Sequence, residues 1–271
     1  MFDWDLYLLG LTITSLLLLL TWIVSLFKHD VSIIDSGWSL LFLAMAIGYT
    51  SPAWLHGELG ARAALLLVLV SLWALRLSLY ISWRNWGEGE DRRYQAIRRK
   101  HEPGFGLKSL YLVFGLQGVL AWLISLPLLA AATSTSELGL LDLAAVALWL
   151  FGFGFETVAD AQLAAFRSDP RNRGAVLERG LWRYTRHPNY FGECLIWWGF
   201  YLLAVAGGGW WSFPAPLLMT LLLLRVSGVA LLERDIGERR PAYRDYVLST
   251  NAFVPGPRKA SPLTGDCGGS A

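Results

Sequence analysis

The residues of this chain best suited to chemistry are an amide and an acid that share one helix face. They follow directly after a cationic turn. Residues 178–198 read ERGLWRYTRHPNYFGECLIWW, in which arginines and a histidine precede Pro188 and in which Asn189 and Glu193 follow four residues apart. Proline favours the first turn of a helix, and residues four apart share a helix face. The free N–H groups of such a helix start favour an anionic ligand. Glu193, about one turn inside an apolar helix, is expected to have a hydrogen-bonding task.

The simpler interpretation of this stretch is that its arginines follow the positive-inside rule and that Glu193 pairs with one of them. Asn189 and Tyr190 are not needed for topology, however, which favours a binding site.

An aspartate also lies near the start of a second apolar stretch, VSIIDSGWSL, where Asp35 and Trp38 share a helix face. An acid within a membrane helix is a candidate functional residue. Pairing of Asp35 with Arg76 or with an arginine of the loop after residue 84 is the structural alternative.

Two further helix faces carry polar and aromatic residues at spacings of three and four. One joins Trp73, Arg76 and Tyr80, and the other joins Glu156, Asp160 and Arg167. The alternative for the second face is a structural network of ion pairs. The polar residues share the cytoplasmic half of their spans, so we expect one inward-opening chamber formed by Asp35, Arg76, Tyr80, Glu156, Asp160, Arg167, Asn189 and Glu193.

Composition places these residues in a membrane protein. Of 271 residues, 55% are hydrophobic and 16% are charged, with a mean hydropathy of +0.43. The net charge of +2 gives no reason to expect a nucleic-acid partner. Cys194 and Cys267 form no disulfide framework or zinc signature, so we expect no metal site.

Apolar runs predict seven transmembrane helices of an all-α bundle near 6–27, 31–50, 62–83, 108–131, 140–166, 189–206 and 211–232. All but three of the 23 Lys and Arg residues lie in alternate connections, the exceptions being Arg62, Arg76 and Arg225. This asymmetry predicts an N-terminus outside and a C-terminus in the cytoplasm. We expect a single bundle over 1–258 and a flexible tail over 259–271. Gly152 and Gly154 form no dinucleotide fingerprint, and we interpret them as sites of close helix packing.

The segment GLWRYTRHPNYFGE resembles the C-terminal signature of the steroid 5-alpha-reductase family, especially its bacterial branch. The similarity continues through FETVADAQLAAFR and YRDYVLSTNAFVPG, over about residues 150–257, and WALRLSLYISWRNWGEGEDRRY also resembles that branch. The resemblance implies a seven-helix bundle in the bacterial inner membrane with a cytoplasmic NADPH site. The implied activity is hydride transfer to an activated C=C bond of a steroid-like or other apolar lipid.

The resemblance implies two sets of site residues. Contacts to NADPH are expected from Asp160, Arg167, Asn189, Tyr190 and Glu193, with Arg171, Arg186, His187, Tyr243 and Tyr246 around the phosphates and adenosine. The candidate catalytic residues are Asp35, Trp38, Trp73, Tyr80 and Glu156. Steroid-reducing members hold the substrate carbonyl with a Gln-Glu pair and a tyrosine, which this sequence replaces with Asp35, Trp38 and Trp73, so a steroid substrate is in question.

Two other functions remain open from the sequence. Membrane methyltransferases that act on isoprenylcysteine or phospholipid head groups share the Arg-His-Pro-x-Tyr segment and use S-adenosylmethionine. The many cations favour the phosphates of NADPH over that zwitterionic cofactor. A small transporter or scaffold would bind neither cofactor, and the absence of an internal repeat counts against it. The sequence does not indicate the substrate, the stereochemistry, the proton donor or the oligomeric state.

Overall fold

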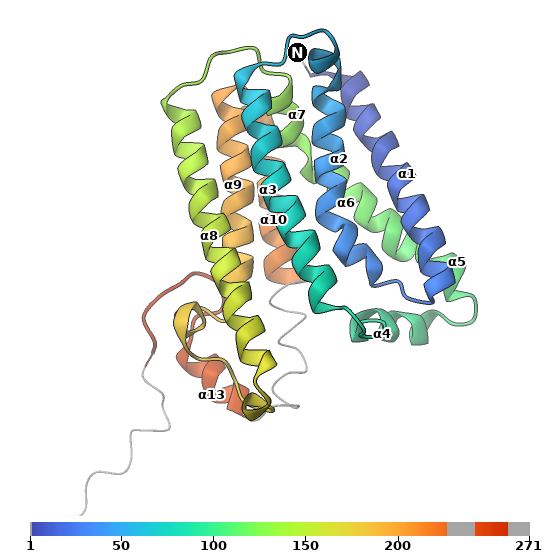
Figure 1. The fold of residues 1–271 in the computed structure, drawn as a ribbon, viewed down its shortest axis with the longest axis vertical. Coiled ribbons are helices and arrows are strands. Elements are labelled where there is room, and N and C mark those ends of the chain that lie inside the picture. Colours follow the sequence, from blue (N-terminus) through green and yellow to red (C-terminus); the bar gives the residue numbers. More distant parts are fainter. Residues whose placement is uncertain (1, 227–241, 260–271) are drawn as a thin grey trace, which may run out of the picture. The chain divides into compact units, whose positions relative to one another are not determined.

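Two compact units make up the part of the chain that the computed structural model describes, residues 2–226 and 242–259. The first unit comprises the described residues up to Leu143 together with Phe200–Ala215. The second comprises Ala144–Gly199 and the described residues from Pro216 onward. Every regular element in the described residues is helical, which confirms the predicted all-α class (Figure 1).

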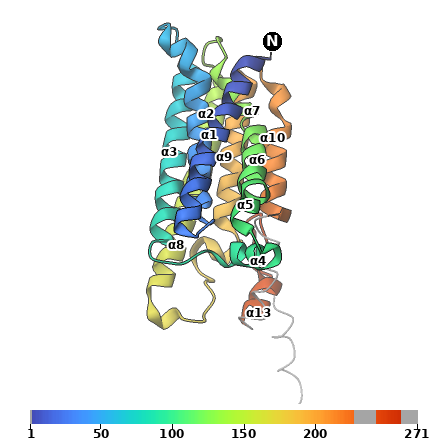
Figure 2. The same cartoon turned by 90° about the vertical axis from the view of Figure 1, so that its right-hand side faces the viewer.

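The first unit is built on three long helices that follow one another along the chain. In Figure 1, α2 lies between α1 and α3, and it packs against both. The helices that lie wholly in this unit are α1 (Trp4–Lys28), α2 (Ile33–Leu55), α3 (Ala61–Arg84), α4 (Arg92–His101), α5 (Phe105–Ser109), the π-helical turn η1 (Leu110–Gly115), α6 (Leu116–Ile124), α7 (Leu126–Ala132) and the short turn η4 (Trp210–Ser212). The short helix α4 lies at the end of the unit where α1 stops and α5 starts (Figure 2).

The second unit contains two long helices and several short ones. These elements are α8 (Leu140–Ser168), η2 (Pro170–Asn172), η3 (Gly180–Arg183), α9 (Pro188–Ala206), α10 (Pro214–Leu221), η5 (Leu222–Val226) and α13 (Ala242–Ser249). The first residues of α8 and the last of α9 belong to the first unit.

Helix α1 shows how local sequence sets an element here. The Asp3 carboxylate accepts a hydrogen bond from the Leu6 N–H at 3.0 Å and caps the helix start, while Lys28 lies in the last turn, where the helix dipole favours a cation. Only 22% of its most apolar window is buried inside the protein. Half of its leucines are exposed and only Leu18 is buried, as expected of a helix surrounded by lipid.

Five of the described helices are long and apolar enough to cross a membrane: Trp4–Lys28, Ile33–Leu55, Ala61–Arg84, Phe105–Ile124 and Leu140–Ser168. They correspond to the first five predicted spans. The predicted sixth and seventh spans fall on α9 and on α10 with η5, and residues 227–232 of the seventh lie outside the described residues. The protein is thus an all-helical membrane protein, while the count of seven spans stays a prediction.

Arg62, an exception to the charge pattern, is a buried structural residue of the first unit. Its Nε and Nη2 atoms donate to the two carboxylate oxygens of Asp142 at 2.7 and 2.9 Å. Its Nη1 atom donates to the Ser134 hydroxyl, and Nη2 also reaches the Glu137 carbonyl. Removing one partner of a buried ion pair typically costs about 3–5 kcal/mol. Arg62 therefore ties the 133–139 connection to the start of α3.

Aromatic side chains fill the core of the same unit. Trp73 is completely buried, with its ring centroid 5.8 Å from that of Phe42 and 6.2 Å from that of Phe200. Tyr7 of α1 stacks on Trp122 of α6 at 4.2 Å. These contacts hold together the helices that carry the candidate residues of the first unit.

Candidate functional site

Glycines bring α8 and α9 into backbone contact in the second unit. A Cβ atom added at Gly152 would lie 2.7 Å from the Gly192 carbonyl oxygen, and one added at Gly192 would lie 2.6 Å from the Glu156 nitrogen. At Gly199 it would lie 2.9 Å from the Cβ of Trp149. The interpretation of Gly152 as a packing residue is thus confirmed, whereas nothing lies within 4 Å of a Cβ at Gly154. The contact places the acidic face of α8 against the start of α9.

Polar side chains gather at this contact. Glu156 and Asp160 of α8 and Glu193 of α9 are all less than a tenth exposed. The Asn189 amide Nδ2 donates to Asp160 Oδ1 at 3.3 Å, and the Trp197 indole donates to Glu193 Oε1 at 3.0 Å. Buried polar groups are retained where they have hydrogen-bonding partners. We call Glu156, Asp160, Asn189 and Glu193 the acidic cluster.

The segment before α9 is held against α8 by hydrogen bonds that the sequence did not reveal. The Gln162 amide oxygen accepts from the Leu181 N–H at 3.0 Å, and the Trp182 indole donates to the Ala159 carbonyl at 3.1 Å. Gly180 has a φ of 62°, a conformation that favours glycine, and a Cβ there would lie 2.5 Å from the Gln162 amide. This anchoring fixes the approach of the chain to Asn189.

Arg186 has a structural task that the sequence analysis did not foresee. Its side chain is buried, and its Nη1 atom donates to the backbone carbonyls of Val247 at 3.1 Å and Thr250 at 2.5 Å, at the end of α13. A cation at these carbonyls caps the helix and complements its dipole. The contacts do not contradict a role at a phosphate, which stays a prediction, but they already occupy the guanidinium in part.

Tyr243 and Tyr246 of α13 pack edge to face, with centroids 5.5 Å apart. The Tyr246 hydroxyl donates to the Trp182 carbonyl, and burial raises the pKa of this phenol above its ordinary value. Both tyrosines therefore connect α13 to the segment before α9. Their predicted role near adenosine remains open.

His187 and Tyr190 form a stacked pair at the start of α9, with ring centroids 5.7 Å apart and planes only 5° from parallel. His187 is buried, and its backbone N–H donates to the Thr185 hydroxyl at 3.3 Å. Tyr190 is half-buried beside Asn189. The stack gives the helix start a flat aromatic surface adjoining the acidic cluster.

The remaining predicted cofactor residues, Arg167 and Arg171, are exposed. Arg171 pairs with Asp169 at 2.7 Å, and this guanidinium lowers the pKa of the Asp169 carboxyl. Its side chain is 89% exposed, so the ion pair contributes little to stability and does not prevent a phosphate from competing for it.

In the first unit, Asp35 has the loop arginine that the structural alternative predicted. Its Oδ2 atom accepts from Arg93 Nη2 at 2.6 Å, and its Oδ1 atom accepts from the Tyr94 hydroxyl, also at 2.6 Å. The Gln117 amide in turn donates to the Tyr94 hydroxyl at 3.1 Å. Burial and the nearby Asp35 carboxylate raise the pKa of Tyr94, which keeps this phenol protonated as a donor.

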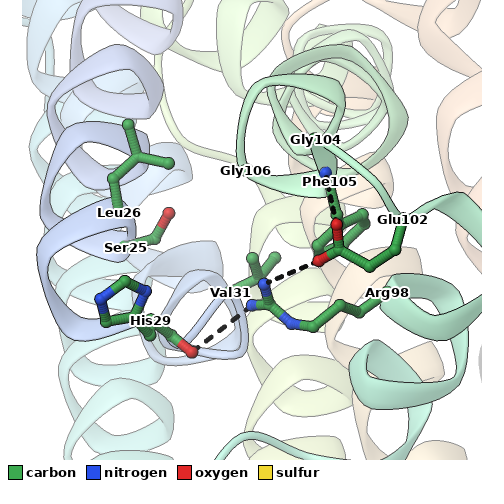
Figure 3. Close-up of a pocket in the computed structure, with 9 residues that line it drawn as sticks. All are labelled: Ser25, Leu26, His29, Val31, Arg98, Glu102, Gly104, Phe105 and Gly106. Carbon is green, nitrogen blue, oxygen red and sulfur yellow. Dashed lines mark hydrogen bonds and ion pairs between the residues drawn. The ribbon is translucent and has the colours of Figure 1, made fainter.

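The segment 85–104, which we call the strap, is tied to the turn between α1 and α2. The Glu90 carboxylate accepts from the Val31 N–H at 2.9 Å and from Arg98 Nη2 at 2.7 Å. Arg98 also donates to the His29 carbonyl and lies over the Phe105 ring at 4.8 Å. A hollow of about 270 Å³ is lined by Arg98 and Phe105 together with Ser25 and Leu26 of α1 (Figure 3). The strap thus covers one end of the unit and delivers Arg93 and Tyr94 to Asp35.

The other candidate catalytic residues have different surroundings. Trp38 meets Phe42 edge to face at 5.4 Å, and the Trp73 ring centroid lies 5.8 Å from that of Phe42 in the apolar core. Tyr80 is half-buried, with the Arg84 guanidinium 5.9 Å from its ring centroid. The catalytic roles of these three residues stay predictions.

The predicted residues therefore form two groups, Asp35 and its strap partners in the first unit and the acidic cluster in the second.

Comparison with known proteins shows the family to which the chain belongs. Residues 21–250 match the family described as "Protein of unknown function (DUF1295)". The chain belongs to the DUF1295 family.

An uncharacterized protein of Schizosaccharomyces pombe, C594.04c, is 25% identical over 274 residues, an alignment that covers 92% of this chain and 79% of the yeast protein. No solved structure matches. The DUF1295 region contains both groups of candidate residues and α13. It also contains the strap and the glycine contact between α8 and α9. The segments that position the candidate residues therefore lie in the DUF1295 region, as the candidate residues themselves do.

Several residues that position the site were missed from the sequence. Gln162, Thr185 and Trp182 act through backbone groups, which a side-chain pattern does not display. Arg93 had a usable signal, because it stands in the run EDRRYQ of the loop after the third span, and an arginine of this loop was the structural alternative for pairing with Asp35, yet the sequence alone did not distinguish it from its neighbour Arg92.

Proposed function

We propose that this DUF1295 protein is a membrane-embedded, NADPH-dependent reductase that transfers hydride to an activated C=C bond of an apolar lipid. The resemblance of residues 150–257 to the steroid 5-alpha-reductase family supports the reaction class, and the acidic cluster supports the cofactor site. The proposal includes seven spans, an external N-terminus and a cofactor site that opens to the cytoplasm.

The observation that carries the proposal is the contact between Asn189 and Asp160 beside Glu193. A primary amide and two carboxylates offer both donors and acceptors. That donor set matches a nicotinamide carboxamide, which also donates and accepts hydrogen bonds. The stacked pair His187 and Tyr190 adds a flat aromatic surface next to it.

Exposed cations suited to phosphates lie in the same unit as the acidic cluster. Arg167 and Arg183 are exposed, as is Arg171 despite its pair with Asp169. Arginine binds phosphate through two parallel N–H donors, which favours it over lysine at such sites. The residues of this chain therefore fit a phosphate-bearing cofactor at the cytoplasmic end of α8 and α9.

Bound NADPH would supply the hydride, and the protein would supply orientation and a proton. In this proposal Asn189 and Glu193 hold the carboxamide, and the exposed arginines hold the phosphates. Asp35, with Tyr94 as its donor, belongs to the substrate side, where a polarised carbonyl needs a hydrogen bond and the reduced carbon needs a proton. The aromatic residues Trp38 and Tyr80 would contact the apolar substrate.

Thermal unfolding of the purified full chain with each cofactor tests the proposal. NADPH at about 100 times its dissociation constant stabilises a one-site protein by about 2.7 kcal/mol. A rise of several degrees in melting temperature with NADPH and none with S-adenosylmethionine supports a reductase. A rise with S-adenosylmethionine alone would assign the protein to the methyltransferases instead, and no rise with either would favour a transporter or scaffold.

A further inference from the structure

A second hollow of the first unit lies at the ends of three candidate spans. It has a volume of about 420 Å³ and is lined by residues that include Lys28, Ser36, Ser82, Trp86 and Glu88. Lys28 is the last residue of α1, Ser36 lies in the first turn of α2, and Ser82 lies in the last turn of α3. Because α1 and α3 end where α2 begins, the hollow lies at one membrane face. We call it the interfacial hollow.

Exposed tryptophan side chains indicate where the interfacial hollow lies relative to the membrane. Trp86 is 86% exposed and the nearby Trp83 is 63% exposed, immediately after the apolar part of α3. Tryptophan is enriched where a membrane helix meets the head-group region, because its ring is apolar and its N–H is polar. The interfacial hollow therefore lies level with lipid head groups.

Four of its polar side chains are not engaged elsewhere, whereas those of Asp30, Ser32 and Asn85 form hydrogen bonds with neighbouring residues. Within the described residues, the side chains of Lys28, Ser36, Ser82 and Glu88 make no hydrogen bond or ion pair. Hydroxyls in membrane helices commonly donate to a carbonyl of their own helix, as Thr21 does to Leu17 at 2.7 Å and Thr50 to Ala46 at 2.9 Å. Ser36 and Ser82 do not, so their hydroxyls remain available to a ligand in the hollow.

One cation, Lys28, and two carboxylates, Asp30 and Glu88, line the hollow, and Asp30 already accepts hydrogen bonds from Ser32. Lys28, the two hydroxyls and the start of α2 suit a phosphate, because each offers a donor or positive potential. Glu88 suits a primary ammonium, which donates hydrogen bonds, and the Trp86 ring suits a cation. The volume falls within the range of about 300–1,000 Å³ typical of small-molecule sites.

We propose that the interfacial hollow binds the phosphoethanolamine head group of a membrane lipid. Lys28, Ser36 and Ser82 contact the phosphate, and Glu88 accepts from the ammonium group. This site uses none of the residues assigned to the cofactor or the substrate carbonyl. Its existence therefore does not depend on the proposed reductase activity.

Native mass spectrometry of the full chain, titrated with single lipids in detergent, tests the proposal. We expect phosphatidylethanolamine to bind at least about tenfold more tightly than phosphatidylglycerol, which has no ammonium group, or phosphatidylcholine, whose quaternary ammonium has no N–H to donate to Glu88. Lys28→Gln and Glu88→Gln should each weaken phosphatidylethanolamine about tenfold, the factor that corresponds to loss of one charge-assisted hydrogen bond.

Exposed residues outside the hollow provide matched controls. Lys100→Gln and Glu58→Gln remove the same charges from exposed positions that do not line it, and they should leave the affinity unchanged. Equal binding of the three lipids by the wild-type chain would overturn the proposal. So would wild-type affinity for phosphatidylethanolamine in both Lys28→Gln and Glu88→Gln, and so would an equal loss in the controls.

Discussion

Two donors at 2.6 Å hold the carboxylate of Asp35, one from Arg93 and one from Tyr94. Both partners donate to the acid, one as a cation and one as a phenol that stays protonated. If Asp35 acts on a substrate carbonyl, these two contacts set its orientation.

Replacement of Asp35 by asparagine should slow turnover roughly a hundredfold, the lower end of what general acid–base catalysis contributes, and leave NADPH binding unchanged. Consumption of NADPH with a panel of enones and unsaturated lipids measures the rate. Asp91→Asn is the matched control, because Asp91 also pairs with Arg93, at 2.9 Å, but does not touch Asp35. Normal turnover in Asp35→Asn would return Asp35 to the purely structural role of anchoring the strap.

A second residue-scale prediction concerns Glu90 and acid. Burial raises the pKa of Glu90, but the hydrogen bonds from Arg98 and the Val31 N–H outweigh it, so the pKa lies below its ordinary value. Because the pKa of Glu90 is lower in the folded protein than in the unfolded chain, the charged carboxylate stabilises the tethered strap above about pH 4.3, the pKa of a free glutamate. This stabilisation is lost as the pH falls through the folded-state pKa.

Amide hydrogen exchange across residues 92–101 should therefore be slow at neutral pH and become faster in acid, after correction for the intrinsic pH dependence of exchange. Glu90→Gln should show fast exchange already at neutral pH. If the amide exchange rates of residues 92–101 at neutral pH are the same in Glu90→Gln and in the wild type, other contacts hold this segment.

At this scale the sequence indicated which acids lie within apolar helices but did not single out their partners. The depth of Asp35 follows from the length of the apolar run, whereas its pairing with Arg93 depends on the path of a loop. Likewise, the pattern around Asn189 indicated a polar helix start, but the contact with Asp160 requires two helices to approach, which one helix period cannot specify.

At the scale of elements, the contact between α8 and α9 is what positions the acidic cluster. Gly152, Gly192 and Gly199 occupy the facing sides, and each leaves room for the other helix only because it lacks a Cβ atom. Membrane helices gain most of their packing energy from such close approach, since lipid offers no hydrophobic driving force between them.

Gly192→Ala should destabilise the protein by about 1–3 kcal/mol, because the added methyl group meets backbone atoms of α8 that cannot move aside. It should also weaken NADPH binding by displacing Asn189 and Glu193. Gly154→Ala is the control, since its Cβ meets nothing within 4 Å. Melting temperatures and NADPH affinities of the two variants decide the point, and equal values for both would show that the helices are not held by this contact.

The sequence predicted the long apolar helices better than the short polar segments. Long apolar runs gave the first five spans closely, because a helix of that length in lipid has no alternative way to satisfy its backbone. The strap helix α4 and the cap of α13 by Arg186 were not predicted, since both are polar segments whose positions depend on ion pairs and carbonyl contacts.

At the scale of the whole molecule, the charge asymmetry predicts that the strap lies in the cytoplasm and that the 133–139 connection lies outside. Single cysteines at Arg99 and at Glu137, in a chain with Cys194 and Cys267 replaced by serine, test this orientation. A membrane-impermeant maleimide should label the Glu137 position in intact cells and the Arg99 position only after permeabilisation. The reverse pattern would invert the topology and place the arginines of the cofactor site on the wrong side for NADPH.

The central claim is that the acidic cluster binds NADPH, and an equilibrium titration of the purified chain with NADPH tests it most directly. We predict saturable one-site binding to the wild type, weakened at least about tenfold in Asn189→Ala and unchanged in Asn85→Ala, with equal melting temperatures for all three in the absence of cofactor. Absence of NADPH binding to the folded wild-type chain, or equal affinity in Asn189→Ala, would contradict the account.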